Sequence, residues 1–248
     1  MSAFAIFLVF STLILGTLAD RDQARQLRRK TRAEWVLDCS GLFVQGTLIP
    51  ILEATAIIAL YAALLPGLRG ALRIPAGAAF LLNFVVVDYL YYWNHRLLHG
   101  RRLWVIHRVH HTVRAMDVVG TSRNTLWSSF FILYLWVNAL FAYLLADPTP
   151  FLLGAAVTAM LDLWRHSALG PRPGSWLERL LAPVLVLPAD HAWHHGRDTV
   201  DQNFGANLKL WDRLHGTLHP WDGDADLPAL GVPSELDLVR SLLWPFPR

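Results

Sequence analysis

Residues 75–99 read PAGAAFLLNFVVVDYLYYWNHRLLH, an apolar stretch that ends in two histidines four positions apart. Only Asn83 and Asp88 interrupt its apolar part. A bilayer-spanning helix needs about 20 apolar residues. The stretch therefore predicts a membrane helix that carries His95 and His99 on one face at its end.

The composition of the whole chain agrees with a membrane protein. The 248 residues are 54% apolar and only 17% charged, whereas an average soluble domain has roughly 25% charged residues. This apolar composition excludes a disordered chain and collagen-like repeats. A disulfide scaffold is excluded because the single cysteine, Cys39, cannot form an internal bridge. The length fits a single membrane domain over residues 1–248.

Five apolar segments follow one another along the chain: Ser2–Ala19, Gly41–Leu65, Pro75–Trp93, Leu126–Ala146 and Phe151–Trp164. The first has no basic residue before it and no clear cleavage site, so we expect a retained helix. The fifth is short and follows the turn at residues 147–150, which suggests the second arm of a helical hairpin. The predicted fold is an all-α integral membrane bundle of four or five helices.

The basic residues predict the orientation in the membrane. The densest basic run lies between the first two segments, and the positive-inside rule places it in the cytoplasm. The stretch from His95 to Thr125 contains six arginines and falls on the same side, so we expect a cytoplasmic histidine-rich domain. The isoelectric point near 9.3 is then mainly a signal of topology. Nucleic-acid binding is not expected, because the basic residues flank membrane spans.

Histidines form three clusters on this predicted cytoplasmic side. The first has the spacing H-x-x-x-H and the other two have H-x-x-H-H, which puts the side chains of each cluster on one helix face. We therefore expect each cluster to aim its imidazoles at one point. The clusters are His95 and His99; His107, His110 and His111; and His191, His194 and His195.

Imidazole is a common nitrogen ligand that suits iron, zinc and copper. Eight or nine such nitrogens exceed the needs of one zinc ion and fit two metal ions. Iron is the first choice, while spacing alone does not distinguish iron from zinc. A pH-sensing patch would not need this repeated spacing, and a lone histidine such as His166, His215 or His219 is more often structural than a ligand.

The ordered clusters resemble the fatty acid hydroxylase and sterol desaturase superfamily, the membrane histidine-box di-iron oxygenases. Two segments after the last cluster strengthen the resemblance: Asn203-Phe204-Gly205 and Trp211-Asp212-Arg213-Leu214-His215-Gly216-Thr217. The resemblance covers roughly residues 81–217, and His215 stands where the family usually has phenylalanine. It implies two Fe ions held by the eight clustered histidines, with His166 as a ninth ligand.

The resemblance also implies the reaction, an O2-dependent hydroxylation or desaturation of a lipid C–H bond by a non-haem di-iron oxidoreductase. Fatty acyl, sterol and related lipids all fit as substrates. No fused redox domain is visible, so electrons would come from a separate donor such as a ferredoxin, cytochrome b5 or a reductase. Two alternatives stay open: a membrane zinc-dependent hydrolase, and a non-catalytic membrane protein with a structural metal site.

Five polar residues near the clusters are predicted to orient the ligand imidazoles. Asp88 lies two helical turns before His95, and Asp162 one turn before His166. Three more follow the last cluster, where capping of helix ends is an equal alternative. The set is Asp88, Asp162, Asp198, Asp201 and Asn203.

The predicted domain has three regions: anchoring helices at 1–75, a catalytic region at 76–219 and a cytoplasmic tail at 220–248. The tail is expected to hold one short amphipathic helix around residues 235–243. No ER-retrieval ending is visible, so a bacterial inner membrane is favoured over the ER membrane.

Overall fold

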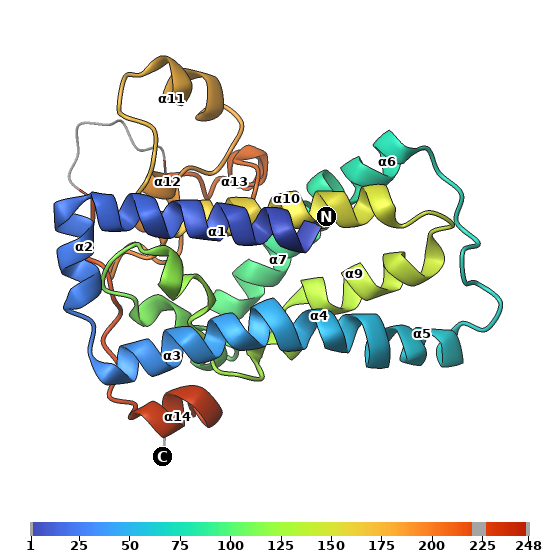
Figure 1. Ribbon diagram of the computed structural model, residues 1–248, viewed down its shortest axis with the longest axis horizontal. Coiled ribbons are helices and arrows are strands. Elements are labelled where there is room, and N and C mark those ends of the chain that lie inside the picture. Colours follow the sequence, from blue (N-terminus) through green and yellow to red (C-terminus); the bar gives the residue numbers. More distant parts are fainter. Residues whose placement is uncertain (1, 220–226, 247–248) are drawn as a thin grey trace.

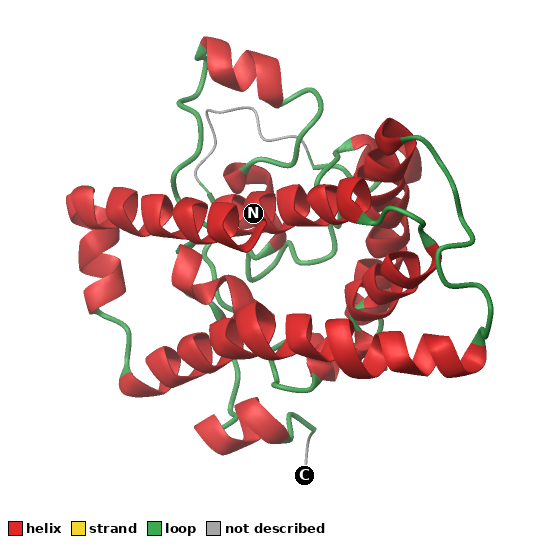
Figure 2. Cartoon of the chain, turned by 45° about the vertical axis from the view of Figure 1, so that its right-hand side comes forward, coloured by secondary structure: helices red, strands yellow, loops and turns green. Residues whose placement is uncertain are grey.

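The computed structural model describes residues 2–219 and 227–246, and every regular element within them is a helix (Figures 1 and 2). The all-α prediction is thus confirmed. Part of the predicted tail, residues 220–226 and 247–248, lies outside the described residues. The α-helices are α1 Ser2–Ala19, α2 Arg21–Arg28, α3 Arg32–Phe43, α4 Ile49–Leu52, α5 Ile58–Leu64, α6 Ala76–Leu81, α7 Asp88–His99, α8 Trp104–His107, α9 Leu133–Leu144, α10 Thr149–Arg165, α11 Trp176–Leu181, α12 Pro188–His194, α13 Leu210–His215 and α14 Leu238–Leu243.

Two continuous helices are long and apolar enough to cross a membrane. Helices α3, α4 and α5 join through short π-helical stretches into one helix, Arg32–Leu64, of about 50 Å. Helices α6 and α7 join in the same way into Ala76–His99, about 36 Å long. In the most apolar 18 residues of the first helix, only 6% are buried inside the protein. Its apolar side chains therefore face outward, as in a helix surrounded by lipid.

A third span forms if α1 and α2 are counted together, although the chain bends by 101° between them. The predicted total of four or five crossings therefore stays a prediction. Helix α10 is shorter than the two continuous helices and packs against α1 and α6. It also contacts α9, the helix before the turn, as the predicted helical hairpin requires.

The predicted segment Leu126–Ala146 is only partly helical, which corrects its expected boundaries. Helix α9 begins at Leu133 because the side chain of Asn94 binds the backbone there: its Oδ1 accepts from the Leu133 N–H at 3.1 Å, and its Nδ2 donates to the Phe131 carbonyl at 2.9 Å. The 12 residues of α9 span about 18 Å, too short to cross a bilayer alone.

The loops after α5 and α9 lie together, at the end of the bundle away from α12 (Figure 1). The Leu72 N–H donates to the Leu144 carbonyl at 2.8 Å, and the Ala146 N–H donates to the Leu72 carbonyl at 3.0 Å. These hydrogen bonds place the two loops at the same end of the bundle.

A buried network of charges joins α3 to the segment that follows the second histidine cluster. The Asp38 carboxylate accepts from Arg123 Nε at 2.6 Å and Nη2 at 3.0 Å, and it also pairs with Lys30. Lys30 pairs in addition with Asp117 at 2.8 Å. All four side chains are at most 8% exposed, so the charges depend on one another for compensation.

This network predicts a large effect of Asp38→Asn on stability. The change leaves Lys30 and Arg123 short of a buried counter-charge, which costs about 3–5 kcal/mol when one partner of a buried pair is lost. We expect the apparent Tm in detergent, followed by tryptophan fluorescence, to fall by roughly 6–20 °C.

Asp22→Asn is the matched control, because its ion pair with Arg25 is exposed on α2. Exposed pairs contribute at most about 1 kcal/mol. Equal shifts of the Tm in the two variants would contradict the assigned role of the buried network.

Candidate metal centre

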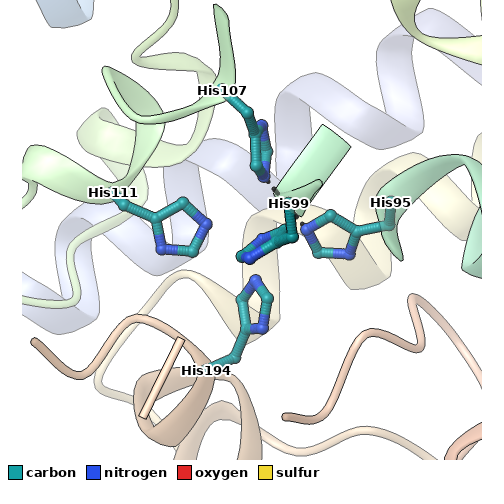
Figure 3. Close-up of side chains that lie close together, drawn as sticks. All are labelled: His95, His99, His107, His111 and His194. Carbon is teal, nitrogen blue, oxygen red and sulfur yellow. Dashed lines mark hydrogen bonds between the residues drawn. The ribbon is translucent and has the colours of Figure 1, made fainter. Parts of the chain in front are cut away.

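Nine histidine side chains meet in two groups inside the protein. In each group the ligand atoms lie within 4.8 Å of one another. Figure 3 shows the imidazoles of the first group pointing toward a common centre. The first group is His95, His99, His107, His111 and His194, and the second is His110, His166, His191 and His195.

Each H-x-x-H-H cluster contributes to both groups, which corrects the expectation that a cluster aims at one point. His107 and His111 enter the first group, while His110 enters the second. His110 and His111 lie in a short 3-10 helix, where successive residues point about 120° apart, so the two neighbours diverge. The last cluster divides in the opposite sense: His194 joins the first group, and the other two histidines join the second.

Several imidazoles are oriented by backbone carbonyl groups rather than by side chains. The Nδ1 atom of His95 lies 2.8 Å from the Phe204 oxygen, and that of His194 lies 2.7 Å from the Gln202 oxygen. A carbonyl oxygen can only accept, so each Nδ1 carries the proton and donates it. The Nε2 atoms of these rings consequently present lone pairs to the centre.

In the second group, too, backbone carbonyl groups accept from Nδ1 atoms, and this brings two Nε2 lone pairs face to face. His110 donates Nδ1–H to the Arg123 carbonyl at 3.2 Å, and His166 donates to the Asp162 carbonyl at 2.8 Å. Their Nε2 atoms therefore both carry lone pairs, yet they lie only 3.2 Å apart. Two acceptors cannot hydrogen-bond to each other. A cation between them would turn this repulsion into coordination.

Burial keeps the imidazoles in the neutral form that a metal requires. It lowers the pKa of His107, His110 and His111 well below the ordinary value, and repulsion between neighbouring histidines lowers it further. The pKa values of the last cluster are lowered for the same reasons. Buried ring nitrogens without a hydrogen-bond partner occur on His99, His111, His191, His194 and His195.

Two of the five polar residues predicted beside the ligands lie near a histidine. The Asp162 Oδ1 atom is 3.2 Å from His166 Nδ1. The Asp201 Oδ1 atom is 3.6 Å from His99 Nδ1, beyond hydrogen-bond distance, and its side chain is 80% exposed.

The other three differ from the prediction. Asp88 accepts from the backbone N–H of Asn207 at 2.8 Å and from Trp211 Nε1 at 2.7 Å. Asn203 bonds to the backbone of Asp190 and His219. Asp198 is exposed to solvent. The Asp88 carboxylate and the Asn203 amide thus organise the backbone.

Asp212 has a positioning role that the sequence did not reveal. Its two carboxylate oxygens accept from the backbone N–H groups of Phe204 at 2.8 Å and Gly205 at 2.7 Å. This holds the Phe204 carbonyl against His95. Burial raises the pKa of Asp212, while these hydrogen bonds oppose the shift. The N-F-G and W-D-R segments were noted as family motifs, but their contact could not be read from their spacing.

Two histidines stay outside both groups, as expected for structural residues. His215 stacks on Tyr92 with ring centroids 5.1 Å apart and also contacts Trp93. His219 stacks on Trp193 at 4.0 Å.

The donor set fits two metal ions. Both groups consist of buried imidazoles, and the facing Nε2 pairs lie 2.9–3.2 Å apart. Metal–imidazole bonds of about 2.0–2.1 Å place neighbouring nitrogens at about this separation. Nitrogen ligands suit iron, zinc and copper alike.

Comparisons with known proteins agree with this site. The chain is 32% identical to an ornithine lipid hydroxylase of Rhizobium tropici over 70% of its own length, which covers 52% of that protein. It is 30% identical to an alkylglycerol monooxygenase of Danio rerio over 66% of its length and 36% of that protein. A fatty acid hydroxylase of a Lecanicillium species is 28% identical over 54% of the chain and 40% of that protein.

The chain thus spans about half, or less, of the length of these curated relatives. No solved structure matches it significantly. The fatty acid hydroxylase family matches residues 80–217, more than half of the chain and the whole stretch that supplies the nine histidines. The chain belongs to the fatty acid hydroxylase family.

Proposed function

We propose that the protein hydroxylates a C–H bond of a lipid with O2, at two iron ions held by the two histidine groups. The observation that carries this proposal is the pair of lone-pair-bearing Nε2 atoms of His110 and His166, 3.2 Å apart in a buried site. A metal cation bound between these two nitrogens would stabilise such an arrangement. The names of the relatives, two lipid hydroxylases and an alkylglycerol monooxygenase, support the lipid substrate.

In this proposal the chain holds and orients the metal ions, and bound iron supplies the redox capacity to activate O2. The carbonyl groups of Phe204, Gln202, Arg123 and Asp162 fix the ring orientations, as outer-shell partners do in other metal sites. Burial of the imidazoles excludes bulk water. The overall change is C–H plus O2, two electrons and two protons to C–OH plus water.

Hydroxylation is favoured over desaturation, because each relative named above is a hydroxylase or a monooxygenase. The two electrons come in this proposal from a separate donor, such as a ferredoxin, cytochrome b5 or a reductase.

The bundle spans a bilayer several times with the metal centre on the cytoplasmic side, as the basic loops indicate. A bacterial inner membrane remains the favoured location.

The competing zinc hydrolase fits the groups less well. A zinc hydrolase needs a carboxylate or similar base beside the metal-bound water. Within the described residues the two groups contain imidazoles only, and the Asp162 and Asp201 carboxylates approach Nδ1 atoms, on the outer side of the rings. A purely structural metal site would give no O2-dependent turnover, so activity separates it from the proposal.

Metal content tests the assignment of ligands to two groups. Protein purified anaerobically from iron-supplemented cells should hold about two irons per chain, one for each group. His166→Ala should reduce this to about one, because it removes a ligand from the group of four only. His110→Ala combined with His194→Ala removes one ligand from each group and should abolish binding.

His215→Ala is the control, since that ring lies in the aromatic cluster outside both groups. It should retain the full iron content, measured by elemental analysis after dialysis against a weak chelator. Absence of metal from the wild-type protein under all loading conditions would refute the proposed centre.

Isotope labelling tests the reaction. With a chemical or enzymatic electron source and a panel of ornithine lipids, alkylglycerols and fatty acyl lipids, 18O2 should place one labelled oxygen in the product, detected by mass spectrometry. Chelated protein should be inactive, and iron but not zinc should restore turnover. Activity with zinc alone, or label entering from H2(18)O, would instead support the hydrolase.

Asp212→Ala tests the indirect support of His95. Loss of the carboxylate frees the N–H groups of Phe204 and Gly205, so the Phe204 carbonyl is no longer held against the ring. Iron affinity of the first group should fall about 10–100-fold, as for other outer-shell changes. Competition with a chelator measures it, and unchanged affinity would show that Asp212 has no such role.

A further inference from the structure

Helix α11 carries an apolar face that no other helix covers in the described chain. It lies midway in the excursion between His166 and His191 and stands away from the bundle (Figures 1 and 2). On the helix Trp176 is 74% exposed and Leu180 63%, and Val184, three residues after its end, is 53% exposed. Exposed apolar groups so close together mark an interaction surface.

Helix α14 shows the same feature on the opposite side of the molecule (Figure 1). Val239, Leu243 and Trp244 are exposed, whereas Ser241 is buried and its carbonyl accepts from Thr125 Oγ1 at 3.0 Å. The polar part of this helix therefore faces the protein and the apolar part faces outward. In water this orientation is unfavourable, because it exposes apolar side chains to the solvent.

We propose that α11 and α14 lie in the headgroup boundary of the bilayer, as two interfacial anchors on either side of the metal centre. Both helices flank the end of the bundle where α1 ends and α3 begins (Figure 1). Leu18 on α1 and Val36 on α3 are exposed there as well. Exposed apolar side chains thus occur on the spanning helices at this end of the bundle as well as on both short helices.

The charges beside α11 fit anionic phospholipid headgroups. A cavity of about 460 Å³ next to this helix is lined by Arg179 and Arg213, with Glu178 as its one acidic residue. Lys209 also lines it, but its charge is paired with the buried Asp190 at 2.7 Å. Tryptophan and basic side chains together are typical of helices at the membrane surface. Anionic lipids attract such basic groups by about 1 kcal/mol each near the surface.

A bilayer explains both apolar faces at once, which a single docked protein does not. The two helices lie on opposite sides of the molecule in both views (Figures 1 and 2). One small redox protein could cover only one of them, whereas lipid surrounds the whole bundle. We therefore assign the bilayer as the occupant.

These anchors are tied to the segments that carry the histidines. Helix α11 lies in the connection from His166 to His191. Arg108, which lies between His107 and His110 in the sequence, holds the segment after α14. Its Nη2 atom donates to the Pro245 carbonyl at 2.7 Å. The membrane surface would thus fix the height of the metal centre relative to the lipid headgroups.

Site-directed fluorescence tests the proposal without measuring turnover. In a Cys39→Ser background, Trp176→Cys and Trp244→Cys are labelled with the fluorophore NBD and reconstituted into vesicles of phosphatidylcholine with some phosphatidylglycerol. Gln26→Cys on the exposed polar face of α2 is the matched control. Spin-labelled lipids should quench positions 176 and 244 but spare position 26, and aqueous iodide should do the reverse.

Iodide quenching at position 176 or 244 that is as strong as at position 26 would overturn the proposal. If an added redox protein then protected the label from iodide, the face would be a protein-binding surface, and the proposal would be overturned in that case too. Leu180→Cys offers a second label site on α11 if the first variant unfolds, and an unchanged thermal transition verifies folding. Because the readout is depth in the membrane, it stays informative even if the lipid hydroxylase activity is not found.

Discussion

The repulsion between buried imidazole nitrogens is the constraint on which the structure depends. His110 and His166 come from segments 56 residues apart, yet their proton-free Nε2 atoms lie 3.2 Å from each other. Each ring has its proton committed to a carbonyl on the far side, so neither can turn to relieve the contact. The surrounding bundle must hold these rings in place against a repulsion that a bound cation would remove.

The support for the rings is built from backbone, and carboxylates shape that backbone from behind. Asp212 and Asp88 gather the N–H groups of residues 204–208, and the carbonyl of Phe204 then reaches His95. On the other side, Asp38 holds the Arg123 side chain while the Arg123 carbonyl accepts from His110. The buried carboxylates of Asp212, Asp88 and Asp38 thus support the imidazoles indirectly, through the backbone. No negative charge from these three residues enters the ligand set.

This indirect support explains which features the sequence could predict. The eight clustered histidines, the apolar stretches and the all-α fold follow from residue type and periodicity, whereas His166 was expected only from the family resemblance. The division of His110 and His111 between two groups does not, because it depends on where the other helices stand. Carbonyl partners carry no side-chain signature. The late start of α9 arises from Asn94, which lies 39 residues before Leu133 and is joined to it only in the folded chain.

The sharing of clusters between groups couples the two proposed ions. His107 and His111 serve one group while His110, on the same short segment, serves the other, and the last cluster is divided likewise. An ion in one group therefore fixes the backbone that presents ligands to its neighbour. Because the metal's binding energy also contributes to folding, the second ion should enter a site already ordered by the first. Cooperative loading would thus follow from the division of each H-x-x-H-H cluster between the two groups.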